Sequence, residues 1–256
     1  MSYKNEKKFN KEDNSGEVIY GRNSVLEALK SGRGVNKLLF SGDYNGSMGQ
    51  IMAEAKERGI VITKTTKEKL DELSGGGNHQ GVAIYVAAAD YAEVDDIFAL
   101  AEEKGEAPFI IILDEIQDAG NLGAIIRTAD AVGAHGIIIP KRRSVPLTAA
   151  VAKSSSGAIS YVKVARVSNL PQTIDSLKER GLWIIGTDLT GETKFYEADL
   201  KGPLGVVIGS EGNGMGRLVR EKCDVVATIP MVGKVSSLNA SVAAGVVLYE
   251  AFRQRN

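Results

Sequence analysis

Residues 109–132 read FIIILDEIQDAGNLGAIIRTADAV, and this stretch decides the fold of the larger part of the chain. Phe109–Leu113 is an uninterrupted apolar run, which is typical of a strand buried on both faces. After a polar loop, the apolar positions are spaced as one face of a helix that begins near Asn121. These positions are Leu122, Ile125, Ile126, Ala129 and Val132. Arg127 falls on the opposite face, so we expect it to point away from the buried side.

Similar apolar runs recur after this stretch and alternate with helical patterns. They lie at 136–139, 161–164, 182–185, 206–208 and 225–229. Short buried strands separated by helices are typical of a parallel sheet, so the fold class predicted for this part is α/β with a largely parallel sheet. Ligands of such sheets bind beyond the carboxyl ends of the strands, and the loops at those ends are therefore the candidate sites.

A glycine-rich loop follows one of these strands. Residues 204–224 read LGVVIGSEGNGMGRLVREKCD, with Gly209, Gly212, Gly214 and Gly216 around Glu211. Such glycine density allows a backbone to approach a ligand closely, although a plain turn is the alternative. The spacing differs from the dinucleotide fingerprint G-x-G-x-x-G, and the Glu211 carboxylate would repel a pyrophosphate, so an NAD site is poorly supported.

A third polar loop leads into the last helix. Residues 227–254 read ATIPMVGKVSSLNASVAAGVVLYEAFRQ, in which Ser236 or Ser237 is expected to cap a long helix. The predicted apolar stripe of that helix consists of Leu238, Val242, Val246, Tyr249 and Phe252, and we interpret it as core packing. Asn239 and Ser241 fall in the first turn, where polar groups could hold a small ligand.

The N-terminal part has its own pattern. Residues 1–15 are polar and lysine-rich and are expected to form a disordered tail. Residues 16–88 predict a compact α/β unit, and the alanine-rich, acidic residues 89–107 are interpreted as a linker to a second domain at 108–256. Within the first unit, helices are predicted at 23–30, 48–58 and 67–73, and strands at 37–40, 60–63 and 82–86.

Composition excludes several classes of protein. The 256 residues are 43% hydrophobic and 25% charged, as in a globular protein. The single cysteine, Cys223, and two histidines argue against an internal disulfide and against a metal site. No run is long enough to span a membrane and no signal peptide is apparent, so we expect a cytoplasmic protein. The net charge of -1 does not by itself indicate nucleic-acid binding, and Lys141–Arg143 fits either a basic RNA-facing surface or a solvated loop.

Taken together, NLGAIIRTA, VIGSEGNGM and IPMVGKVSSLNASVAAG resemble, in order and spacing, the three motifs of the SpoU family of RNA ribose 2′-O-methyltransferases. The N-terminal unit, including NHQGVAI at 78–84, is similar to the family's small RNA-binding domain, which is like ribosomal protein L30e. The resemblance covers nearly the whole chain after the tail. It extends most closely to bacterial enzymes that methylate a guanosine of large-subunit (23S) ribosomal RNA.

This resemblance implies a catalytic domain with a trefoil knot, S-adenosylmethionine (SAM) bound in the knotted loops, and a homodimer in which the C-terminal helix contributes to the interface. Carried over to matching positions, the expected cofactor-binding residues are Thr187, Gly209, Ile229, Ser237 and Leu238. Contacts at Gly209, Ile229 and Leu238 would be made largely by the backbone.

Arg127 is the residue that the resemblance makes catalytic. A guanidinium normally stays protonated, so our hypothesis is that Arg127 stabilises a developing alkoxide or a neighbouring phosphate and is not a literal base. Asn121, Glu211 and Asn239 would position Arg127 and the ribose. Without the resemblance, Arg127 would be interpreted as a solvated arginine and Asn121 as a helix cap.

Three alternatives stay open from the sequence. The same chemistry could act on transfer RNA or on a ribosomal uridine, or the chain could be an RNA-binding assembly factor without activity. Intact Asn121, Arg127, Glu211, Ser237 and Asn239 argue against the last. His79 is expected to be structural or RNA-facing and not catalytic.

Overall fold

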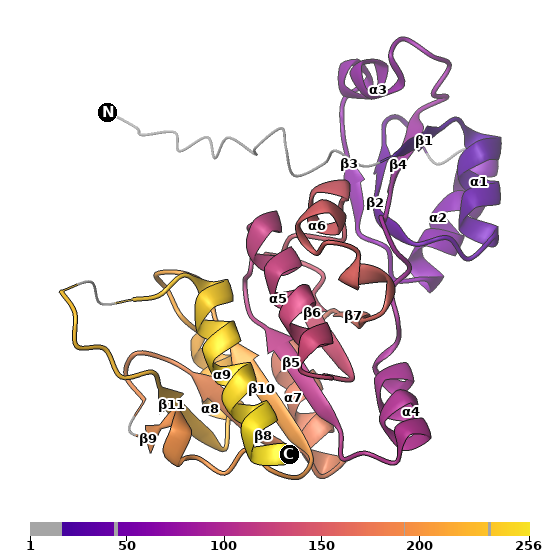
Figure 1. The fold of residues 1–256 in the computed structure, drawn as a ribbon. Helices are drawn as coiled ribbons and strands as arrows, with labels where there is room; N and C mark the ends of the chain where they lie inside the picture. The colour runs from indigo at the N-terminus through magenta and orange to yellow at the C-terminus, as the bar shows by residue number, and fades with distance from the viewer. Residues whose placement is uncertain (1–16, 44–45, 192, 235–236) are drawn as a thin grey trace. The chain divides into compact units, whose positions relative to one another are not determined.

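The computed structural model describes residues 17–43, 46–191, 193–234 and 237–256 (Figure 1). The expected tail at 1–15 lies outside these residues. The chain divides into two compact units. The first comprises the N-terminal residues to Asp90 together with Pro146–Ala150, and the second comprises Tyr91–Val145 and Val151–Asn256.

The first unit contains a four-stranded sheet in the order β1-β4-β2-β3. Its elements are β1 (Val18–Tyr20), α1 (Arg22–Lys30), β2 (Val35–Phe40), α2 (Ser47–Glu57), β3 (Ile62–Lys64), α3 (Lys67–Ser74) and β4 (Val82–Val86). β4 runs antiparallel to β1 and β2, whereas β2 and β3 are parallel. All three helices and three of the strands were predicted to within a few residues, and the short β1 was not.

Side chains of the central strands alternate between two apolar clusters, as the pleat of a strand requires. Leu38 of β2 and Ile84 of β4 belong to a cluster with residues of α1 and α2. Leu39 and Ala83 belong to a second cluster with Leu70 of α3. The sheet therefore has apolar packing on both faces.

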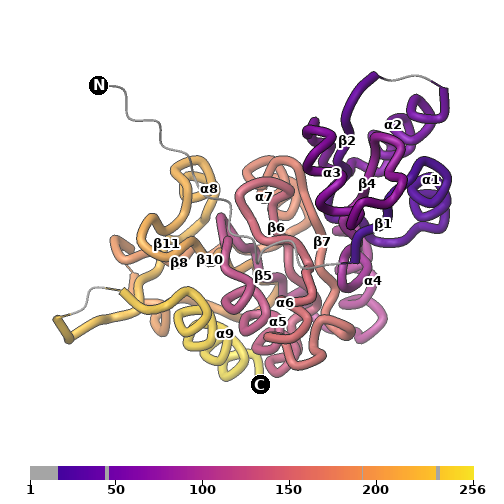
Figure 2. Tube along the Cα trace, turned by 90° about the horizontal axis from the view of Figure 1, so that it is seen from above, coloured from indigo at the N-terminus to yellow at the C-terminus, as the bar shows by residue number. Residues whose placement is uncertain are grey.

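The second unit contains a seven-stranded sheet in the order β7-β6-β5-β10-β8-β11-β9, and every pair in it is parallel. Its strands are β5 (Phe109–Leu113), β6 (Gly136–Pro140), β7 (Lys163–Val167), β8 (Trp183–Thr187), β9 (Thr193–Lys194), β10 (Leu204–Ile208) and β11 (Val225–Thr228). Its helices are α4 (Val94–Lys104), α5 (Ala119–Ala131), α7 (Leu170–Glu179), α8 (Arg217–Lys222) and α9 (Ala240–Arg255), while α6 (Ala149–Ser154) spans the division between the units. The predicted parallel α/β class is confirmed, and Figure 2 shows α7 and α8 on one side of the sheet with α5 and α9 on the other.

Residues 89–107 differ from the expected linker because they contain α4. Ile97 of this helix is fully buried in the cluster that includes Ile110 of β5 and Ile174 of α7. A Cβ on Gly136 would lie 2.6 Å from Ile97, so α4 packs directly on the start of β6. The acidic side chains of the segment lie on the exposed side of this helix.

Two predictions about helix ends and faces were wrong. α9 begins after Asn239, whose Oδ1 accepts hydrogen bonds from the backbone N–H groups of Ser241 and Val242, so Asn239 is the cap in place of Ser237. Ser236 lies outside the described residues. The predicted core stripe of α9 is also largely exposed: Val242, Val246, Tyr249 and Phe252 are 51%, 39%, 53% and 40% exposed. The buried face of α9 instead consists of Ala240, Ala244, Val247, Leu248 and Ala251.

Candidate active site

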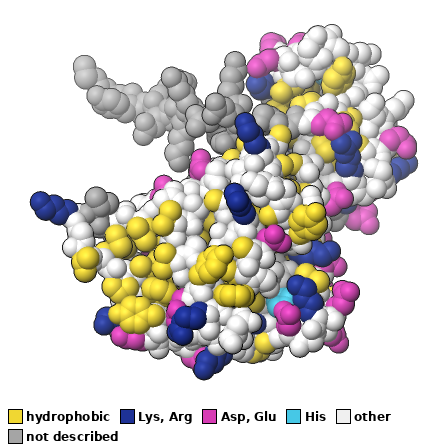
Figure 3. Space-filling model, in the orientation of Figure 1, with side chains coloured by type: hydrophobic (Ala, Val, Ile, Leu, Met, Phe, Trp, Pro, Cys, Tyr) yellow, Lys and Arg dark blue, Asp and Glu magenta, His cyan; other side chains and the backbone are white. Residues whose placement is uncertain are grey.

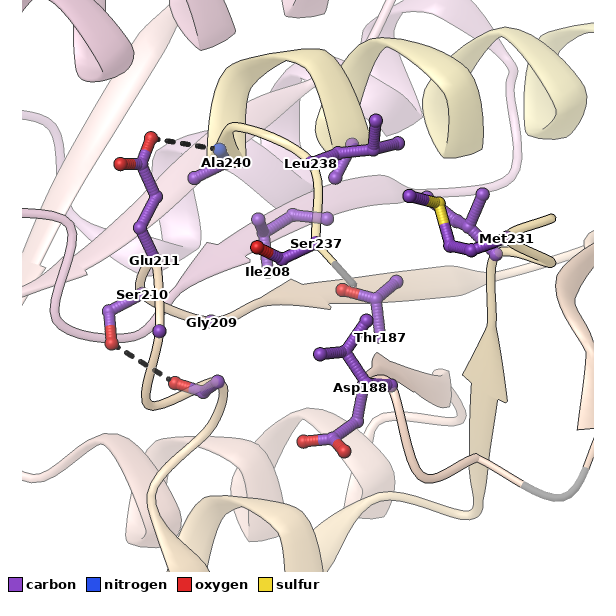
Figure 4. Close-up of a pocket in the computed structure, with 15 residues that line it drawn as sticks. Thr187, Asp188, Ile208, Gly209, Ser210, Glu211, Met231, Ser237, Leu238 and Ala240 are labelled. Atoms are coloured by element: carbon purple, nitrogen blue, oxygen red, sulfur yellow. Dashed lines mark hydrogen bonds between the residues drawn. The ribbon is translucent and has the colours of Figure 1, made fainter. Parts of the chain in front are cut away.

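Three loops at the carboxyl ends of neighbouring strands enclose one pocket of about 640 Å³, part of it open to solvent (Figure 4). The loops follow β8, β10 and β11, and the last of them leads into α9. The pocket is lined by Thr187, Asp188, Leu189, Ile208, Gly209, Ser210, Glu211, Gly212, Gly214, Ile229, Met231, Ser237, Leu238, Ala240 and Ala243. All five residues expected to bind the cofactor are among them, so positions from three separate loops of the sequence share one pocket.

The glycines of the β10 loop are required by the close approach of its own backbone. A Cβ on Gly209 would collide with the backbone of Gly214 and Met215. Ser210 and Gly214 exchange two backbone hydrogen bonds of 3.0 Å, which close the loop on itself. Gly212 and Gly214 have φ values of 85° and 63°, a region that favours glycine. The loop therefore presents backbone groups to the pocket at Gly209.

A polar cluster borders this pocket and joins all three motifs. Glu211 Oε1 accepts hydrogen bonds from Asn121 Nδ2 at 2.9 Å, from the backbone N–H of Ala240 at 3.1 Å, and from Asn239 Nδ2. Asn239 Nδ2 also donates to Asn121 Oδ1 at 2.8 Å. Figure 4 shows the Glu211 carboxylate directed at the start of α9. Three of the four predicted catalytic residues are thus brought together in one network.

Arg127, the fourth, lies apart from this cluster. It is exposed on α5, while Leu122, Ile125, Ile126 and Ala129 of the same helix are fully buried, as the periodicity predicted. Within the described part of the chain its one hydrogen bond runs from Nη1 to Ser156 Oγ at 3.5 Å. Its guanidinium is therefore available to a ligand.

The serine loop beside α5 was missed by sequence reasoning. Ser154 Oγ donates to Ala119 O at 2.9 Å, and a Cβ on Gly123 would collide with Ser154. Ser156 adopts a φ of 51°, which is uncommon for a residue other than glycine. The consecutive serines at 154–156 were the available signal, because small polar residues permit such close packing on a helix.

Two further carboxylates hold the loops together and were also missed. Asp114, which follows β5, accepts a hydrogen bond from the backbone N–H of Gly216 at 2.7 Å, and burial raises its pKa. Asp188 accepts from Thr190 and pairs with Arg220 at 3.0 Å. Burial acts to raise the pKa of Asp188, but the hydrogen bonds from Thr190 and the charge of Arg220 together lower it.

Neither a cluster of metal-ligating side chains nor a membrane-spanning helix is found among the described residues. No group of three or more potential metal-ligating side chains occurs among them. Burial raises the pKa of the Cys223 thiol to about 12, so this group stays protonated. No described helix is long and apolar enough to cross a bilayer.

The lining of the pocket is chemically suited to SAM. Ile208, Ile229, Met231 and Leu238 give it apolar walls, and Gly209 contributes backbone atoms to its lining. An adenine ring needs apolar surfaces for its faces and backbone donors and acceptors for its edge. Both are present here.

Comparison with known proteins identifies both units. Residues 108–249 match the SpoU rRNA methylase family, and residues 18–92 match the RNA 2′-O ribose methyltransferase substrate-binding family. A Bacillus subtilis protein whose name places it in the TrmH family of tRNA/rRNA methyltransferases is 54% identical over 241 residues, covering 94% of this chain and 96% of the relative.

Solved structures agree with this assignment. The AdoMet-bound rRNA methyltransferase of Sinorhizobium meliloti has a TM-score of 0.57 and 26% identity, covering 92% of this chain and 86% of that one. The TrmH/SpoU tRNA-modifying enzyme of A. aeolicus has a TM-score of 0.53 and 33% identity, but the match covers 58% of this chain and 76% of that one. The chain belongs to the SpoU family and is a SAM-dependent RNA 2′-O-ribose methyltransferase.

Proposed function

We propose that this enzyme methylates the ribose 2′-hydroxyl of a guanosine in large-subunit ribosomal RNA. The observation that carries the chemistry is the pocket bordered by the Asn121–Glu211–Asn239 cluster, in which all three motifs meet. The preference for ribosomal RNA is supported by the share of this chain that each solved structure matches. The rRNA methyltransferase of Sinorhizobium meliloti matches both units, whereas the tRNA-modifying enzyme of A. aeolicus matches 58% of the chain. The choice of guanosine rests on the resemblance of the motifs.

We assign cofactor binding to Thr187, Gly209, Ile229, Ser237 and Leu238. Leu238 and Ile229 provide apolar walls, and Gly209 provides a backbone surface without a side chain. Thr187 Oγ1 donates to Val207 O at 3.0 Å, which ties the end of β8 to β10 beneath the pocket. When bound, SAM supplies an electrophilic methyl group on a sulfonium. The proposed trefoil knot would be formed by these same loops.

The acceptor hydroxyl must lose its proton as its oxygen bonds to the methyl carbon and the carbon–sulfur bond breaks. Arg127 stabilises the developing negative charge, or a neighbouring phosphate, through its protonated guanidinium. Asn121, Glu211 and Asn239 keep the loops in place around the ribose. The proton itself passes to solvent or to an RNA phosphate.

We further propose a homodimer that uses the exposed apolar face of α9. Val242, Val246, Tyr249 and Phe252 all lie on this helix and are exposed in the single chain. Figure 3 shows hydrophobic side chains gathered on the face that carries α9. Burying such a face against a second copy would remove apolar surface from water. A Tyr249→Glu variant that remained dimeric in sedimentation would contradict this interface.

The proposed activity is tested by transfer of labelled methyl from SAM to unmodified ribosomal RNA and transfer RNA in separate reactions. Wild type and Arg127→Ala are compared, with SAM binding measured for both. Label at a guanosine ribose of large-subunit RNA, absent in the variant, supports the proposal. Label on transfer RNA or on a uridine would support the proposed methyl transfer to a ribose but would contradict the proposed ribosomal guanosine as substrate. SAM binding without transfer to either RNA favours the assembly-factor alternative.

A further inference from the structure

One exposed aromatic side chain stands out in the first unit. Tyr20, at the end of β1, is 36% exposed, and it is the only large hydrophobic side chain exposed in the described residues of this unit. It packs against Gly77, where a Cβ would lie 2.6 Å from the hydroxyl oxygen and 2.8 Å from a ring carbon. The ring can lie against the backbone of residue 77 because that residue has no side chain.

The surroundings of Tyr20 are fixed as well. Gln80, with a φ of 50°, accepts hydrogen bonds from Arg22 N at 2.9 Å and from Arg22 Nε at 3.2 Å. His79 is buried, accepts from Gly81 N through Nδ1, and donates from Nε2 to Asp71 at 3.0 Å. These bonds fix the loop that joins α3 to β4 and give His79 a structural role.

The same loop carries no bulky side chain at its start. Gly75 and Gly76 have positive φ values, and an added Cβ at either would meet nothing within 4 Å. Aromatic rings and arginine side chains are elements with which proteins bind unpaired RNA, and the glycines leave the start of this loop without bulky side chains. This combination favours a nucleic-acid contact at Tyr20.

We propose that Tyr20 stacks on an unpaired base of the substrate RNA and that Arg22 contacts the adjacent phosphate. This inference rests on the proposed function for its RNA partner, and it assigns the contact surface within the first unit. Because any base offers a flat face, the contact adds affinity with little sequence preference.

The test uses the full chain and fluorescein-labelled 12-nucleotide oligoadenylate, with a 12-base-pair RNA duplex for comparison. Tyr20→Ala is expected to weaken binding of the single strand about 10-fold, with little change on the duplex. Tyr20→Phe retains the ring and is expected to bind as wild type. Arg22→Gln is expected to lower the salt slope of log K by about one. Tyr196→Ala removes an exposed tyrosine of the second unit and serves as the matched control.

A second measurement does not depend on the alanine variant folding. Tyr20→Trp in a Trp183→Phe background has a single tryptophan, whose fluorescence is expected to be quenched when oligoadenylate binds. The proposed RNA contact at Tyr20 would be overturned if Tyr20→Ala bound oligoadenylate with unchanged affinity and the fluorescence of the Tyr20→Trp protein was not quenched. Methyl transfer by wild type in the same preparation separates this failure from failure of the proposed function.

Discussion

Glu211 and Arg127, the charged side chains of two motifs, are held in opposite ways. Glu211 Oε1 accepts three hydrogen bonds from Asn121, Asn239 and Ala240. Arg127 makes one long hydrogen bond, to Ser156, within the described part of the chain. A side chain with its bonds satisfied inside the protein organises the site, whereas one with few internal bonds remains available to substrate. This difference supports the proposal that Glu211 organises the site and that Arg127 acts on the substrate.

The largest expected effect follows from removing Arg127. Arg127→Ala is expected to lower kcat by about 100-fold or more, the usual loss when a group that stabilises transition-state charge is removed. Melting temperature and SAM affinity should stay near wild type, because the side chain is exposed and outside the pocket. Arg127→Lys is the matched variant: near-normal rates would show that the planar guanidinium is not needed.

Removing Glu211 should give the opposite pattern. Glu211→Ala leaves three donors without their acceptor, and we expect a loss of about 1 kcal/mol in the free energy of unfolding. SAM affinity should fall about 10-fold, which corresponds to about 1.4 kcal/mol of binding free energy. Calorimetric titration with SAM and thermal unfolding measure both. Unchanged values in Glu211→Ala would end the assignment of Glu211 to architecture.

Sequence reasoning predicted the parallel sheet from local patterns, whereas the cofactor residues of the pocket were expected from the resemblance of three motifs to a known family. Apolar runs such as Phe109–Leu113 and the loops after them can be found without tertiary information. Periodicity alone could not reveal the exposed face of α9, since the spacing of Val242 and Val246 is the same whether the face meets the core or solvent. Asp114 and Ser156 were missed because their partners, Gly216 and Arg127, are distant in sequence.

Ser156 offers a smaller test of how Arg127 is held. Ser156→Gly suits the positive φ and removes the hydroxyl, and we expect kcat to fall about fivefold, the equivalent of one ordinary hydrogen bond. Ser156→Asn also tolerates this backbone region and restores an acceptor, so it should recover part of the rate. The KM for SAM should not change in either variant. A change in KM alone would indicate a structural role for the loop.

The smallest expected effect concerns Asp188, a second carboxylate of the pocket, which differs from Glu211 in having a charged partner, Arg220. Its folded-state pKa is lowered, so its contribution to stability is present above the unfolded pKa of about 3.9 and is lost as pH falls through the folded value. Asp188→Asn should therefore cost about 0.5 kcal/mol at pH 7 and less at pH 3. Urea unfolding at both pH values measures this difference.

Added salt should reduce the cost of Asp188→Asn at pH 7 because ions screen the pair with Arg220. The Glu211→Ala effect, which arises from neutral donors, should persist. An Asp188→Asn cost that was equal at both pH values would show that the carboxylate acts through geometry and not through charge.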